Sequence, residues 1–182
     1  MNILPLALTV AFPVAVLTML AAQQSSQPEL AHTRTEFSFT ADAPLEQAAP
    51  LFGANEERKW SPDWNPQFLY PQPARDQPGM VFQIAHGQHT ATWVNTAFDL
   101  AAGHIQYSYV LGDAMATLID IHLTRQGPQS THVNVVYERT ALIAVANEHV
   151  QHFAQRDQRA DKEWEEAINA YLAKTSVSPA KK

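Results

Sequence analysis

Residues 114–140 read AMATLIDIHLTRQGPQSTHVNVVYERT, with two alternating segments on either side of a turn at Gln126–Gln129. Alternation of apolar and polar side chains is typical of strands that bury one face. If the two segments pair across this turn, Ile121 lies opposite Val135, and apolar residues at every second position share one face. The stretch therefore predicts an antiparallel hairpin with one apolar face and one polar face.

Turn signals recur at short intervals before this hairpin, as expected for a meander of antiparallel strands. Gly87-Gln88 and Gly112-Asp113 are two-residue turns between alternating segments. The predicted strands are Thr33–Thr40, Phe68–Tyr70, Gly79–His86, His89–Asp99, His104–Leu111, Ala114–Arg125 and Ser130–Thr140. We therefore expect a curved antiparallel sheet of six or seven strands.

Helical patterns flank the predicted sheet on both sides. Residues 44–52 read PLEQAAPLF and begin with a proline that fits the first turn of a helix, and Ala54–Lys59 can form a second short helical turn. From Ala144 to Lys174, apolar residues recur at spacings of three and four, which predicts one long amphipathic helix. The order of elements predicts an α+β fold in which the sheet wraps around this C-terminal helix.

Four segments carry a family resemblance, namely FSFTADAPLEQAAPLF (37–52), WSPDWNP (60–66), GMVF (79–82) and STHVNVVYERTAL (130–142). Together with the order of elements, they resemble the START/SRPBCC superfamily, which includes polyketide cyclase/dehydrase-like proteins. The resemblance implies a helix-grip fold with a cavity for sterols, lipids, polyketides or other apolar molecules. Only some members of this superfamily catalyse a reaction, and they share no catalytic motif. No active-site residue is therefore carried over.

The N-terminal segment predicts the cellular location. Residues 3–22 carry no charge and are long enough to span a bilayer as a helix. We interpret residues 1–22 as a signal peptide or an N-terminal membrane anchor, 23–32 as a polar linker, 33–174 as the helix-grip domain and 175–182 as a disordered tail. Both interpretations predict an exported domain, periplasmic or extracellular, which stays attached to the membrane if the segment is not cleaved.

The composition argues against several classes of function. The chain has 182 residues, a net charge of −6 and only 12 lysines and arginines, which argues against a nucleic-acid partner. It has no cysteine, so disulfides, thiol nucleophiles and cysteine-bound zinc are excluded. No nucleophile elbow, phosphate-binding loop, dinucleotide-binding glycine motif or metalloprotease motif is present. We expect no cofactor, and the expected partner is a small hydrophobic ligand.

Residues predicted to contact this ligand come from the apolar face of the sheet, the proline-rich loop and the final helix. They combine aromatic rings, which supply apolar area, with buried polar groups that need a partner. The predicted ligand contacts are Trp60, Trp64, Phe82, Ile84, Trp93, Asn95, Ser108, Thr117, Ile119, Phe153 and Trp164. For the tryptophans other than Trp93, the alternative is that they fill the core. A single bulge in the fourth or fifth strand would instead turn Ile105, Tyr107 and Tyr109 inward.

Titratable residues at strand ends are weaker candidates for catalysis. His86 and His89 flank a two-residue turn and are expected to be cross-strand neighbours. They could share a metal ion or act as acid–base groups, and the alternative is a solvated pair. Asp99 is a third candidate if burial raises its pKa. His122 and His132 lie on the polar face of the last hairpin, which we interpret as a wet surface rather than a weak metal site. We assign no metal site.

The fold prediction leads to three hypotheses for function. The first is an exported protein that binds a small apolar or amphipathic ligand, such as a lipid, sterol or polyketide-like molecule, in a cavity between sheet and helix. The second is a cofactor-independent cyclase or dehydratase that uses the same cavity. The third is a membrane-anchored interaction or stress protein whose cavity is filled by its own side chains.

Overall fold

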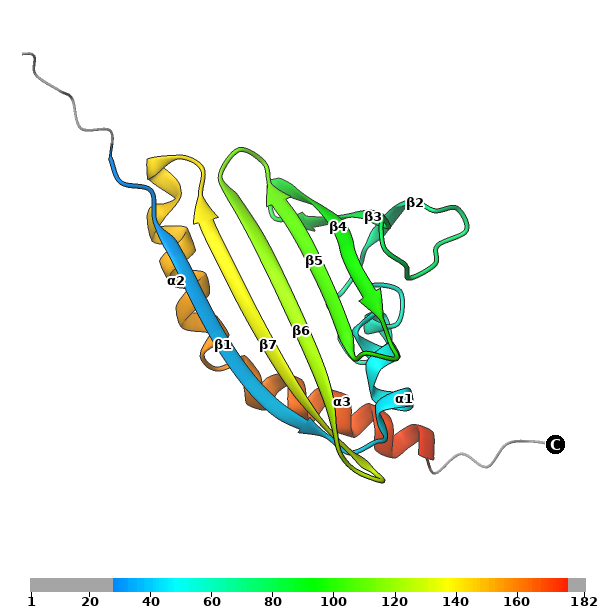
Figure 1. Ribbon diagram of the computed structural model, residues 1–182. Coiled ribbons are helices and arrows are strands. Elements are labelled where there is room, and N and C mark those ends of the chain that lie inside the picture. The colour runs from blue at the N-terminus through cyan, green and yellow to red at the C-terminus, as the bar shows by residue number, and fades with distance from the viewer. Residues whose placement is uncertain (1–27, 177–182) are drawn as a thin grey trace, which may run out of the picture.

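The computed structural model describes residues 28–176 and shows one curved antiparallel sheet with helices along one side (Figure 1). Its seven strands lie in the order β1-β7-β6-β5-β4-β3-β2, so the first strand pairs with the last. The strands are β1 (His32–Ala41), β2 (Gln67–Tyr70), β3 (Val81–His86), β4 (His89–Asp99), β5 (His104–Leu111), β6 (Met115–Gly127) and β7 (Ser130–Ala141). The predicted α+β helix-grip architecture is confirmed.

Short helices connect β1 to β2, and two longer helices follow β7. The helices are α1 (Leu45–Ala48), α2 (Asn147–Asp157) and α3 (Ala160–Ser176), with 3-10 turns η1 (Ala49–Phe52), η2 (Glu57–Lys59) and η3 (Ala144–Ala146). Helix α2 packs on β1 and β7, and α3 packs on β1. The sheet therefore has an inner face toward the helices and an outer face on the opposite side.

The hairpin of β6 and β7 has the predicted register. Ile121 pairs with Val135 and Leu123 with Val133, and all four side chains are buried on the inner face. Alternate residues of the same strands remain partly exposed on the outer face. The two-face pattern seen in the sequence thus positions the core as expected.

A β-bulge in β4 changes the register of the next strand. The pairing of β4 with β5 shifts between Asn95 and Ala97, which adds one residue to β4. Because side chains alternate between faces, this extra residue turns Tyr107 and Tyr109 inward, where both are buried. Ser108 consequently lies on the outer face, so its predicted inward position is wrong. The alternative register, with a bulge, is the one that the protein adopts.

The periodicity predicted one long C-terminal helix, but the structure has two consecutive helices, α2 and α3. Helix α2 ends at Asp157, a turn at residues 158–159 follows, and α3 begins at Ala160. Figure 1 shows that α2 and α3 run in different directions, so the pair follows the bend of the sheet. The apolar spacing continues across the break, which is why the sequence pattern did not reveal it.

The predicted export or anchor segment at residues 3–22 lies outside the described residues. Within residues 28–176, no helix is long and apolar enough to cross a membrane. The end of the predicted linker is attached to the domain: the amide of Asn147 donates to the carbonyl of Glu29 at 2.9 Å and accepts from the backbone N–H of Ala31 at 2.8 Å. The described chain therefore enters β1 from a fixed position beside α2.

Candidate functional site

A cavity of about 330 Å³ lies between the inner face of the sheet and helices α2 and α3. Its walls come from η2, the loop after it, strands β3 to β7 and both helices. The lining residues are Glu57, Trp64, His86, Trp93, Tyr107, Tyr109, Ile119, Ile121, Tyr137, Arg139, Phe153, Arg156, Asp157, Ala160, Glu163 and Trp164. The cavity thus combines a wall of aromatic rings with a cluster of charged side chains.

The aromatic wall is centred on Trp93. Its indole stacks on the ring of Tyr109 at a centroid distance of 4.1 Å and an angle of 24°. Trp64 meets the same indole edge-on at 5.4 Å and 85°, and Tyr107 does so at 6.2 Å and 71°. The indole N–H of Trp93 is buried without a hydrogen-bond partner in the described chain. Such a donor beside a cavity is suited to a polar atom of a ligand or a water molecule.

The polar wall contains a buried ion pair. Arg139 pairs with both carboxylate oxygens of Asp157, with Nη2 at 3.2 Å from Oδ1, and the hydroxyl of Thr35 donates to Oδ2 at 2.8 Å. The guanidinium also lies 4.2 Å from the ring centre of Tyr137. Burial of such a pair is tolerated only when its donors and acceptors are satisfied. Nε of Arg139 lacks a partner among the described residues, so one cationic donor remains available.

Glu57 adds a carboxyl group that is protonated at neutral pH. Burial of the carboxyl, and next the negative charge of Asp76, raise the pKa of Glu57 to about 8. The residue as a whole keeps some exposure, and it is one of the residues that line the cavity. A neutral carboxylic acid donates a hydrogen bond and adds no charge. Burial similarly raises the pKa of Tyr107 well above its usual value, and its hydroxyl donates to the carbonyl of Phe52 at 2.9 Å.

The remaining charges of the cavity balance one another. Arg139 and Arg156 contribute two positive charges, and Asp157 and Glu163 contribute two negative ones. Because Glu57 is neutral at pH 7, the cavity has no net charge from these five residues. An uncharged ligand suits such a site best, since an ion would enter without a counter-charge.

The structure brings five of the predicted ligand contacts to the cavity, and they are Trp64, Trp93, Ile119, Phe153 and Trp164. The side chains of Trp60, Phe82 and Ile84 are buried in the core and do not line it. Trp60 donates from its indole to the carbonyl of Leu51 at 2.7 Å, which fixes it as a core residue. Asn95 and Thr117 are buried on the inner face but also lie outside the lining, and Ser108 is on the outer face.

The predicted catalytic candidates lie in three different environments. His86 lines the cavity at its exposed rim, where partial burial lowers its pKa. His89 is its cross-strand partner, as expected from the turn, but does not line the cavity. Asp99 accepts a hydrogen bond from the backbone N–H of Ala102 at 2.9 Å, so it caps a turn instead of facing the cavity.

Comparison with solved structures shows that known proteins share this fold. Norcoclaurine synthase from Thalictrum flavum, in complex with dopamine and hydroxybenzaldehyde, superimposes with a TM-score of 0.60 over 93% of this chain and 98% of that chain, at 10% identity. The Zhui aromatase/cyclase from Streptomyces sp. R1128 superimposes with a TM-score of 0.56 over 80% of this chain and 94% of that chain, at 16% identity. The chain has a helix-grip fold, which is consistent with the resemblance to the SRPBCC superfamily. At these identities the likeness concerns the fold, and no family model or curated protein matches the sequence.

The helix-grip cavity contains polar residues that sequence reasoning missed, although two of them carried a signal. Arg139 occupies an inward position of β7, in phase with Val135 and Tyr137. Asp157 lies four residues after Phe153 in the apolar stripe of the last helical region. Opposite charges at inward positions, one on β7 and one on the helix that follows it, indicate a buried ion pair. Glu57 lies in a short irregular segment, where no periodicity marks the direction of its side chain.

Proposed function

We propose that this protein binds a small, uncharged aromatic molecule that carries hydroxyl or carbonyl groups, in the cavity between the sheet and helices α2 and α3. The observation that carries the proposal is the pairing of an aromatic wall with a charge-balanced polar wall. Trp93 and Tyr109 supply a stacking surface, while Glu57 and Nε of Arg139 supply hydrogen-bond donors. These groups match the two ends of a phenol-like ligand.

The cavity volume narrows the ligand class. A volume of about 330 Å³ is near the lower limit of roughly 300–1,000 Å³ for small-molecule sites. One or two fused rings suit this volume better than a sterol or a long acyl chain. The norcoclaurine synthase neighbour, in complex with dopamine and hydroxybenzaldehyde, supports this size class because both are single-ring aromatics.

Export of the protein belongs to the same proposal. The uncharged segment at residues 3–22 supports it, either as a cleaved signal or as an anchor. N-terminal sequencing of the protein from its own host tests this part. A mature protein that begins near Gln23 indicates a cleaved signal, an intact segment in the membrane fraction indicates an anchor, and an intact segment in the cytoplasm contradicts export.

Calorimetric titration with 2-naphthol tests the cavity directly. Ile119 lies between Tyr107 and Tyr137 on the inner face, so Ile119→Trp fills the cavity and is expected to weaken binding at least about tenfold. Leu118→Trp is the matched control, because the neighbouring side chain points to the outer face. The proposal fails if 2-naphthol does not bind the wild-type protein, or if both variants bind it equally well.

Two related ligands test the polar wall. Naphthalene has the same rings as 2-naphthol but no hydroxyl group, so it is expected to bind more weakly because the buried donors then stay unpaired. 2-Naphthoate carries a charge and is also expected to bind more weakly, because the site has no net counter-charge. Stronger binding of 2-naphthoate than of 2-naphthol would contradict the assignment of an uncharged ligand.

A second candidate function is acid–base catalysis in the same cavity. The raised pKa of Glu57, about 8, provides a proton donor at neutral pH. A dehydration or cyclisation of a hydroxylated ligand needs such a donor. Incubation of the ligand with wild-type and Glu57→Gln protein, followed by mass analysis, separates the two functions. Conversion by the wild-type protein alone supports an enzyme, and an unchanged ligand supports a binding protein.

The third hypothesis, an interaction protein with a filled cavity, receives no support. A protein of that kind would pack its inner face directly against the helices. The space of about 330 Å³ between them is far larger than the volume of roughly 30 Å³ that a single water molecule occupies. A ligand-sized space therefore favours the first two functions over this one.

A further inference from the structure

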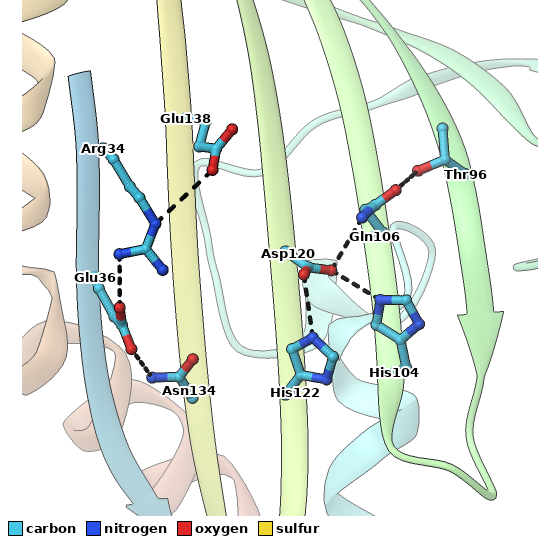
Figure 2. A network of polar contacts seen from close by, with 9 residues as sticks. All are labelled: Arg34, Glu36, Thr96, His104, Gln106, Asp120, His122, Asn134 and Glu138. Carbon is cyan, nitrogen blue, oxygen red and sulfur yellow. Dashed lines mark hydrogen bonds and ion pairs between the residues drawn. The ribbon is translucent and has the colours of Figure 1, made fainter. Parts of the chain in front are cut away.

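A second cluster of polar side chains lies on the outer face of the sheet, away from the cavity. His104 of β5 and His122 of β6 are directly paired across the two strands. Asp120 lies two residues before His122 on β6, so its side chain is on the same face. Figure 2 shows the three side chains converging between the two strands. Strand register thus brings together three residues of the β5–β6 hairpin.

The three side chains of this cluster lie close enough together to hold one metal ion. Nε2 of His104 lies 2.8 Å from Oδ1 of Asp120, and Nε2 of His122 lies 3.1 Å from Oδ2. The two imidazole rings stack with centroids 4.6 Å apart and an angle of 6° between planes. One ligand atom from each residue can be chosen so that all three lie within 4.8 Å of one another.

These separations suit a small divalent ion. Zinc binds imidazole nitrogen and carboxylate oxygen at about 2.0–2.2 Å, so its ligand atoms lie roughly 3.3 Å apart in a tetrahedral site. Small rotations of the side chains would bring the three atoms of the cluster to that spacing around one ion. Two imidazoles with one carboxylate favour zinc and neighbouring transition metals over calcium or magnesium, which prefer oxygen ligands.

The surroundings hold the carboxylate in position. Nε2 of Gln106 donates to Oδ1 of Asp120 at 3.1 Å, and Oε1 of Gln106 accepts from the hydroxyl of Thr96 at 2.8 Å. A chain of this kind orients a ligand before the metal binds. Within the described part of the chain, no lysine or arginine forms an ion pair with Asp120. A cation therefore meets no competing positive side chain at the carboxylate.

We propose that His104, Asp120 and His122 form a binding site for a divalent transition-metal ion of the zinc class. The three side chains remain 33%, 29% and 52% exposed, so the fourth coordination position faces solvent. Three protein ligands with one open position is the arrangement that keeps a bound water on zinc. The site is independent of the proposed ligand cavity, because its side chains lie on the opposite face of the sheet.

The weak metal sites considered from the sequence included His86 with His89 and His122 with His132, but none combined His122 with His104 and Asp120. His132 of that hairpin pairs with Thr124, one strand away from the cluster. The amide of Asn134 donates to Glu36 at 2.9 Å (Figure 2). The third ligand, His104, comes from β5 and pairs directly with His122 on β6.

Zinc titration of the full chain, purified without an affinity tag, tests the proposal. Calorimetry is expected to show one ion bound per chain, and cobalt is expected to give the visible absorption of a four-coordinate site. His122→Ala removes one ligand and is expected to weaken zinc binding at least about tenfold. His132→Ala is the matched control, since it removes an outer-face histidine outside the cluster.

Asp120→Asn serves as a second variant, because it keeps the shape of the side chain while removing the charge. Circular dichroism of both variants checks that the sheet is intact. Weakened zinc binding in folded His122→Ala and Asp120→Asn, with His132→Ala unchanged, supports the site. The proposal is overturned if the wild-type chain binds neither zinc nor cobalt, if Asp120→Asn binds zinc as the wild type does, or if the control loses binding equally.

Discussion

The inner and outer faces of the sheet carry the same kinds of charged group in opposite environments. On the inner face, Arg139 and Asp157 pair with side chains only 4% and 10% exposed. On the outer face, Arg34 and Glu36 pair at 2.8 Å with side chains 54% and 46% exposed. Water screens the second pair and barely reaches the first. Burial, rather than the presence of an ion pair, therefore decides how much each pair affects stability.

Carboxyl groups show the same contrast through their pKa values. Burial raises the pKa of Glu57, on the cavity side, to about 8. Burial also tends to raise the pKa of Asp120 on the outer face, but hydrogen bonds with His104, His122 and Gln106 hold it below its usual value. A carboxyl group is thus neutral on one side of the sheet and ionised on the other. The inner face suits an uncharged molecule, and the outer face suits a cation.

Breaking the buried ion pair has the largest expected effect. Asp157→Ala leaves the guanidinium of Arg139 buried without a counter-charge, and this is expected to lower the free energy of unfolding by about 3–5 kcal/mol. Glu36→Ala breaks the exposed pair and is expected to leave stability nearly unchanged. Urea denaturation of both variants measures the difference. Equal losses in the two variants would show that the two faces do not differ as described.

The next largest expected effect is a dependence of stability on pH, which follows from the raised pKa of Glu57. In the folded protein Glu57 keeps its proton up to a pKa of about 8, against a usual value of 4.5. Between these values the unfolded state binds fewer protons than the folded state does. The contribution of Glu57 to the free energy of unfolding therefore falls as pH rises, by at most about 1.4 kcal/mol per pH unit. Above the folded pKa there is no further loss.

Glu57→Gln removes this dependence while keeping the size of the side chain. Relative to the wild type, the variant is expected to gain stability steadily as pH rises through the window between 4.5 and about 8. Denaturation curves at several pH values in this window measure the gain. A constant difference between variant and wild type across the window would contradict the raised pKa of Glu57.

Local alternation was sufficient to predict most of the sheet. The register that pairs Ile121 with Val135 follows from side-chain period and turn position alone, and the structure has it. The curved sheet and the helical region after it also followed from the order of elements, whereas the pairing of the first strand with the last was not predicted. Patterns of this kind are visible because each strand keeps one face buried over several residues.

Features that depend on a single residue could not be predicted in the same way. The bulge near Asn95 adds one residue to β4 without changing the alternation on either side, and it decides that Tyr107 faces the cavity while Ser108 does not. The break between α2 and α3 follows Asp157, whose carboxylate pairs with Arg139, 18 residues away along the chain. The grouping of polar side chains in the cavity, and in the outer-face cluster, also depends on which strands pair. The sequence shows these pairings only in part.

The smallest expected effect concerns two threonine hydroxyls, one on each face. The hydroxyl of Thr117 is buried on the inner face and lacks a hydrogen-bond partner among residues 28–176. Thr117→Val replaces it with a methyl group of similar size, so a gain of about 1 kcal/mol in the free energy of unfolding is expected. Thr96 on the outer face donates to Gln106, and Thr96→Val is expected to lose up to about 1 kcal/mol. Opposite signs for the same substitution, measured by urea denaturation, follow from the different surroundings of the two hydroxyls. A loss of stability in both variants would mean that a bound water molecule already satisfies Thr117, and the inner face would then be wetter than its side chains indicate.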